Sequence, residues 1–160
     1  MRRGLLLLPL SCILVAACSS GNGGSGDAKA VIPTPSTVPS TGTQAVYVLS
    51  VDPAAHSITV DPIEYLTGEA ATKEFKKMYP AASRGPANDY VIVNLTQDHV
   101  VLPLAATAPV RVVSSGGVDH NDPVPTTQAA FAHYSGLGSR PFWITTNTGT
   151  VTGVKEQFIP

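Results

Sequence analysis

The residue best placed for chemistry in this sequence is Cys18, one of only two cysteines in the chain. It directly follows the small residues Ala16 and Ala17, at the end of an apolar run over residues 5–15. Small residues let a chain lie close in a peptidase cleft, and among protein side chains only a thiol accepts a thioether-linked group. Small residues at the end of an apolar run are typical of the cut site of a secretory signal.

The residues before Cys18 have the pattern of an export signal. Arg2 and Arg3 form a short positive start, the apolar run follows, and small residues precede the cut. The run is too short for a mature membrane-spanning helix, which needs about 20 apolar residues. We therefore interpret residues 1–17 as a cleaved signal peptide of the general secretory route. A twin-arginine signal fits the Arg pair only loosely.

Residues 15–18 (VAAC) resemble the bacterial lipobox, which is an aliphatic residue followed by two small ones and a cysteine. The resemblance implies that a diacylglyceryl group is attached to Cys18 and that the chain is cleaved before it. Two acyl chains anchor a protein firmly, whereas one anchors it only marginally. The expected location is the outer, extracytoplasmic face of the cell membrane. A plain signal peptide with an incidental cysteine is the alternative.

Composition excludes several classes of function for the mature chain. Cys12 leaves with the signal and Cys18 carries the lipid, so no thiol remains for nucleophilic, redox or metal chemistry. Removing Arg2 and Arg3 leaves eight basic and eleven acidic residues, with no basic block. Nucleic-acid binding therefore lacks its electrostatic basis. Without a basic surface, we expect the protein to attach to the membrane through the lipid on Cys18 alone.

Histidines and loop residues suggest no metal or catalytic site. The four histidines are spaced without an i,i+4 pair, and residues 119–122 (DHND) do not continue as an EF-hand calcium loop. Residues 114–117 (SSGG) precede His120 but make no known nucleophile motif. We interpret these stretches as solvated turns and predict no catalytic, cofactor-binding or metal residue.

Carboxylates and aromatic residues are the remaining candidates. Asp61 and Glu64 are close in sequence, and Asp52 could approach Asp61 across a hairpin, as acid/base chemistry requires. Acidic residues are rarely buried, so we interpret these as solvated strand ends. Aromatic side chains, Trp143 among them, favour core or cross-strand positions, but a partly exposed Trp143 would be a natural contact residue.

The elements that must position these residues begin after a linker. Residues 18–44 are rich in Gly, Ser, Pro and Thr, and a coil of that length reaches about 30 Å. Residues 45–160 are then expected to form a single globular domain. Enrichment in β-branched and aromatic residues predicts a strand over 45–51, and alternation of apolar and polar residues predicts one over 57–61. Further strand-like runs cover 90–94, 99–104, 109–113, 141–146 and 150–158.

Two helices complete the prediction. The first runs from an N-cap at Thr67 to Tyr79, with an apolar face made by Ala71, Phe75, Met78 and Tyr79. The second covers residues 125–134. Short loops favour antiparallel pairing. The expected fold class is α+β: a small curved antiparallel sheet, open or closed into a barrel, with one or two short helices.

Several segments resemble a group of uncharacterised small lipoproteins and secreted proteins from actinobacteria. They are residues 63–70 (IEYLTGEA), 88–90 (NDY), 141–145 (PFWIT) and 154–160 (VKEQFIP). The resemblance covers most of residues 45–160 and implies an envelope location and a single domain. The group has no established activity, so it assigns no site residue.

These observations predict a membrane-anchored binding or adaptor module of the cell envelope that is not an enzyme. Its partner would be another envelope protein, a wall polymer or a small ligand. The alternatives are an envelope enzyme of unrecognised type, with polar residues from separate strands, and a structural or stress-related lipoprotein without a specific ligand.

Overall fold

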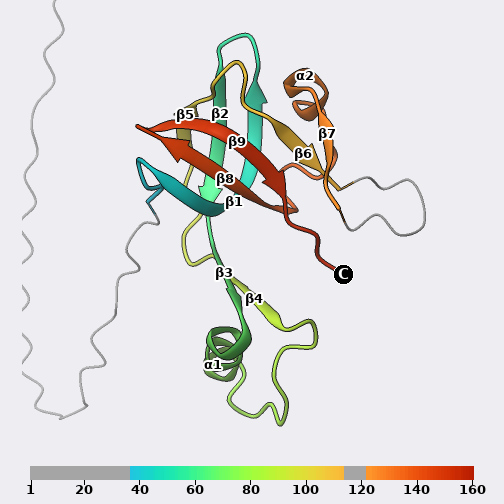
Figure 1. The fold of residues 1–160 in the computed structure, drawn as a ribbon. Coiled ribbons are helices and arrows are strands. Elements are labelled where there is room, and N and C mark those ends of the chain that lie inside the picture. Colours follow the sequence, from blue (N-terminus) through green and yellow to red (C-terminus); the bar gives the residue numbers. More distant parts are fainter. Residues whose placement is uncertain (1–36, 114–121) are drawn as a thin grey trace, which may run out of the picture. The chain divides into compact units, whose positions relative to one another are not determined.

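The computed structural model describes residues 37–113 and 122–160 (Figure 1). The described residues all belong to one compact unit of the chain. The described elements are, in order, β1 (Gly42–Asp52), β2 (Ser57–Pro62), β3 (Glu64–Thr67), α1 (Gly68–Met78), β4 (Tyr90–Val93), β5 (Val100–Pro103), β6 (Val110–Val112), β7 (Val124–Thr126), α2 (Gln128–Phe131), β8 (Pro141–Asn147) and β9 (Thr150–Glu156). Strands with two short helices confirm the α+β class.

Seven of the strands form one sheet in the order β5-β2-β1-β8-β9-β6-β7, and β3 and β4 pair separately. All neighbours in the large sheet are antiparallel except β6 and β9, which are parallel. The expectation of an antiparallel sheet was therefore wrong at this pair. The connection from β6 to β9 contains β7, α2 and β8, which is long enough to return the chain in the same direction.

The large sheet curls strongly but is not closed into a barrel. Three strands separate β5 from β9, which in a flat sheet would hold them about 19 Å apart. Nevertheless the amide of Ala105, just after β5, donates to the carbonyl of Val151 in β9 at 2.9 Å. Leu104 and Val151 form a single isolated bridge there. Pro103 has no N–H with which to extend the bridge, so closure stops at one contact.

The concave face of the curled sheet holds the hydrophobic core. Alternate residues of each strand point inward, as a pleated strand requires. α2 adds Phe131, whose ring meets Phe142 edge-on with centroids 5.3 Å apart. The buried cluster consists of Val46, Val48, Ile58, Val60, Leu104, Ala108, Val110, Val112, Phe131, Phe142, Ile144, Val151 and Val154.

Two hairpins frame this core, as the sequence predicts. β1 and β2 pair antiparallel across a short turn, and β8 and β9 join through Thr148 and Gly149. Both turn residues have positive φ, 47° and 79°, the geometry that matches the twist of paired strands. β1 starts at Gly42 instead of Ala45, because residues 42–44 of the expected linker pair with β8.

Between β2 and β5 the chain makes an excursion through β3, α1 and β4 (Figure 1). The helix matches its prediction closely, although Thr67 makes no side-chain cap hydrogen bond. Its expected apolar face is only partly covered: Ala71 is buried, but Met78 and Tyr79 are 45 % and 57 % exposed. Two short strands are too small to cover four side chains of a helix. No described helix has the length and apolarity needed to cross a membrane.

The second helix is shorter than expected and starts later. Residues 124–126 form β7, in which Pro125 pairs with Arg111 of β6, so the expected start of the helix is a strand. α2 begins only after Thr127, whose hydroxyl accepts from the amide of Ala130 at 3.1 Å. This cap determines where helical geometry can begin.

Candidate functional site

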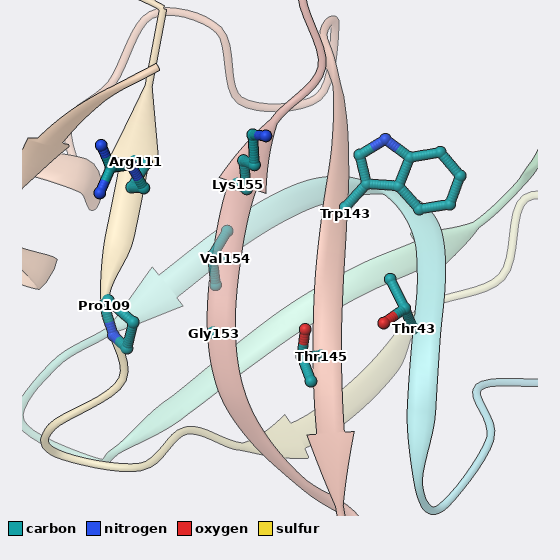
Figure 2. A pocket seen from close by; sticks show the side chains of 8 residues that line it. All are labelled: Thr43, Pro109, Arg111, Trp143, Thr145, Gly153, Val154 and Lys155. Carbon is teal, nitrogen blue, oxygen red and sulfur yellow. The ribbon is translucent and has the colours of Figure 1, made fainter. Parts of the chain in front are cut away.

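The convex face of the large sheet carries an open groove. Because Phe142 and Ile144 point into the core, Trp143 and Thr145 of β8 point to the opposite face. The groove has a volume of about 260 Å³ and crosses β1, β8, β9 and the start of β6 (Figure 2). We call it the outer-face groove; its lining residues are Thr43, Pro109, Arg111, Trp143, Thr145, Gly153, Val154 and Lys155.

Strand register places two cations and an indole in one row across this groove. Arg111 of β6 lies opposite Lys155 of β9, and Lys155 lies opposite Trp143 of β8. Neighbouring strands are about 4.8 Å apart, so the three side chains are consecutive neighbours. Arg111 and Lys155 are both exposed, and Figure 2 shows the three residues on adjacent strands.

Neither cation is neutralised by a carboxylate of the described chain. The only ion pairs within 4.0 Å in residues 37–113 and 122–160 are Lys77–Glu74 and Arg140–Glu156. Arg111 donates from Nε to the carbonyl of Pro123 at 3.2 Å, which leaves its charge uncompensated. Like charges directly opposite each other on neighbouring strands are destabilising. A bound anion would relieve this repulsion.

The indole of Trp143 is held in a defined position. Its Nε1 donates to Oε1 of Gln157 at 2.9 Å. Its ring meets Tyr65 edge-on at a centroid distance of 5.9 Å, and Tyr65 stacks on Tyr90 at 5.3 Å. Burial, with the nearby Tyr90, raises the pKa of Tyr65. With its N–H already used, the indole can offer a ligand only its apolar ring surface.

Gly153 keeps the groove open between Thr145 and Pro109. A Cβ at Gly153 would lie 3.9 Å from the Thr145 side chain, which is ordinary contact. Its backbone does not have the left-handed conformation that favours glycine. The absence of a side chain here leaves the groove open beside the register shift of the β8–β9 pairing.

The lining of the groove is suited to binding. Its charged groups are both cations, and none of the eight lining residues is an acid, a histidine or a cysteine. Proton transfer most often uses a histidine, which this lining does not contain. The lining can instead provide charge, hydrogen bonds from threonine hydroxyls and an aromatic surface.

Several residues considered from the sequence lie outside the described residues. These are Cys18, residues 114–117, and the Asp119, His120 and Asn121 part of the polar loop. The other three histidines, His56, His99 and His133, are exposed in separate turns and loops. No group of three or more His, Cys, Asp or Glu side chains within residues 37–113 and 122–160 could hold a metal ion.

The carboxylates near the first hairpin have structural partners. Asp52 accepts from the amides of Ala54 and Ala55 at 3.0 and 2.9 Å and so shapes the β1–β2 turn. The expectation of a solvated strand end was wrong for Asp61. It is buried and accepts from Asn94 Nδ2 at 2.7 Å and the Asp98 amide at 2.9 Å, which compensate its burial.

The expected approach of Asp52 to Asp61 was wrong. Asp61 pairs with Tyr47, whereas Asp52 lies at the turn end of the same hairpin, opposite Ser57. Five residues along β1 separate these positions, which corresponds to about 16 Å. Glu64 is exposed on β3, so these acids form no catalytic pair.

The sequence did not indicate one buried carboxylate, which lies on the inner face of β9. Glu156 is 1 % exposed and accepts from the Val113 amide at 2.6 Å, the Tyr134 hydroxyl at 2.8 Å and Arg140 Nη1 at 3.0 Å. Burial and the bond to Glu156 raise the pKa of Tyr134 to about 12. The arrangement is internal and structural.

Sequence reasoning noted Trp143 but missed Arg111 and Lys155. The alternation in residues 110–112 and 154–156 could have placed each cation on the outer face, but only the parallel pairing of β6 and β9 brings them together.

Comparison with protein-family models, curated proteins and solved structures finds no match for this chain.

Proposed function

We propose that this chain is a membrane-anchored, extracytoplasmic binding or adaptor module of the cell envelope, and that the outer-face groove is its binding site. The observation that carries the proposal is the row of Arg111, Lys155 and Trp143 along the groove. Two cations without a described carboxylate partner, beside a rigidly held indole, are suited to holding a ligand and not to transforming one.

The tether supports the same function. Cys18 would carry the lipid, and the segment that follows would let the folded domain reach about 30 Å from the membrane. A module tethered in this way meets partners fixed in the envelope at high effective concentration. Affinity in the groove can therefore be modest and still be useful.

Site-specific cross-linking in cells tests this proposal directly. A photoreactive phenylalanine derivative would replace Thr145, which is exposed and lines the groove. The same derivative at Val101, 66 % exposed on β5, is the matched control outside the groove. Irradiation should give a discrete adduct from position 145 and none from position 101.

A second pair of variants connects the adduct to the cations. The double variant Arg111→Gln and Lys155→Gln should abolish the adduct. The double variant Arg84→Gln and Lys76→Gln, which removes two exposed charges elsewhere, should retain it. Equal adducts from positions 145 and 101, or none from position 145, would contradict a binding role for the groove.

A further inference from the structure

We infer that the outer-face groove binds an anionic saccharide chain, with a sugar ring against Trp143 and a carboxylate or phosphate of the same chain on Arg111 and Lys155. This inference rests on the proposed function, because it names the class of ligand for that site. Carboxylate and phosphate share the chemistry that matters here, which is an anion carried on a chain of sugar rings.

The anion follows from the two cations. Arg111 and Lys155 are direct neighbours on parallel strands and repel each other, and no described carboxylate pairs with either. An oxyanion between them would accept charge-assisted hydrogen bonds from both side chains. Bonds of this kind are about twice as strong as neutral ones.

Trp143 is the reason to expect a sugar ring in the ligand. Its N–H is committed to Gln157, so the groove side of the indole offers an apolar, polarisable surface. The C–H-rich face of a pyranose ring is complementary to such a surface. Thr43 and Thr145 border the same groove and can bond to sugar hydroxyls.

Position in the sheet argues against a peptide ligand. Extended peptides are commonly recognised through the main chain of an exposed edge strand. The strands of the groove, β1, β8, β9 and β6, are all interior and pair with neighbours on both sides. The groove therefore has no free strand edge to which the main chain of a peptide could bind. Its side chains must select the ligand instead, through the ligand's charge and its ring.

Charge argues against a nucleic acid. The full chain has a formal net charge of −1, and the groove provides only two cations. Binding to nucleic acids depends on neutralising a series of phosphates with a basic surface. Two cations beside one aromatic ring suit a chain of lower charge density.

Trp143 provides a direct reporter, because it is the only tryptophan in the chain. The full-length protein in detergent would be titrated with oligogalacturonate, which has rings with carboxylates, and with a sugar-phosphate polymer. Neutral maltohexaose has rings alone, polyglutamate has carboxylates alone, and a thymidine oligonucleotide represents nucleic acid. At least one of the first two probes should change the Trp143 fluorescence saturably, with Kd at least about ten-fold lower than for the other three.

Variants separate specific binding from charge attraction. Arg111→Gln or Lys155→Gln should weaken binding of the preferred probe about ten-fold each, because each removes bonds to a charged group. Lys76→Gln should leave it unchanged. Gly153→Val should abolish binding by filling the groove, while an unchanged urea midpoint shows that the fold persists.

The outcomes distinguish the two proposals. Tighter binding of polyglutamate or of the oligonucleotide, or equal binding by the double Gln variant, would overturn the saccharide inference. A groove-specific adduct in cells without saccharide binding would refute the ligand class and leave the binding function standing. Absence of both the adduct and saccharide binding would refute the binding function and the ligand class together.

Discussion

Glu156 and Lys155 are adjacent in β9 but carry their charges to opposite faces of the sheet. Glu156 points inward and accepts three hydrogen bonds, so its burial is compensated. Lys155 points outward beside Arg111, where no described acid compensates it. The internal charge therefore serves the fold, whereas the external pair has no carboxylate partner among the described residues and would be available to the proposed ligand.

Removing the internal charge should cost stability. Glu156→Gln is expected to lower the free energy of unfolding by about 3 kcal/mol, because it leaves the Val113 amide, the Tyr134 hydroxyl and Arg140 with an incompletely matched partner. Urea denaturation measures this loss. Glu64→Gln, at an exposed acid, is the control and should change stability by less than about 0.5 kcal/mol. Equal losses in the two variants would contradict the assigned role of Glu156.

Alkaline pH should weaken the same region through Tyr134. Its pKa is raised from 10.0 in the unfolded chain to about 12 in the fold by burial and by Glu156. The unfolded state therefore loses this proton first, so the stabilisation is complete below pH 10.0 and is lost as pH rises toward about 12.

The comparison is between the wild type and Tyr134→Phe. Stability measured across this alkaline range should fall less steeply in Tyr134→Phe, which has no proton to lose at this position. Parallel pH profiles would show that Tyr134 does not contribute to the alkaline loss.

At the scale of elements, the side-chain cap at its first turn helps to stabilise the very short helix α2. α2 has only four residues, yet it delivers Phe131 to the core. Thr127 begins it with a side-chain cap, whereas Thr67 occupies the equivalent position of α1 without one. The two threonines therefore form a natural matched pair.

Thr127→Ala should lower the free energy of unfolding by about 1 kcal/mol, because the amide of Ala130 loses its side-chain acceptor. Thr67→Ala should change it by less than about 0.5 kcal/mol. Urea denaturation of the two variants side by side provides the measurement. A larger effect at Thr67 would contradict the difference between the two helix starts.

At the scale of the whole molecule, the proposed function combines an export and anchoring segment with a folded domain. Some residues of the outer sheet face are covered, since Tyr65 of β3 lies against Trp143 and residues 94–98 cover Asp61. The outer-face groove lies on a part of that face that stays open. The uncovered part of the outer face therefore remains a surface for contact.

Anchoring makes a prediction about the whole chain. Cys18→Ser should move the protein from the membrane fraction to the soluble or secreted fraction, and intact mass should show loss of the lipid, because a hydroxyl cannot form the thioether. Cys12→Ser is the matched control, since Cys12 lies within the expected signal. Unchanged membrane retention of Cys18→Ser would refute the anchor.

What the sequence determined by itself was local. Strand-forming residue types and alternation revealed most strands, turn residues revealed both hairpins, and apolar spacing revealed α1, because each depends on residues a few positions apart. A positive start, an apolar run and small residues before a cysteine predict the export signal, and these features are local as well. Trp143 could be noted as a contact residue for the same reason.

Only the tertiary structure decided which strands became neighbours. The parallel register of β6 and β9 brings Arg111 beside Lys155, and residues far apart in sequence surround Glu156. The curl that ends in one bridge at Val151 likewise belongs to no single segment. Such pairings depend on loop closure and on packing of the entire core, which no local pattern encodes.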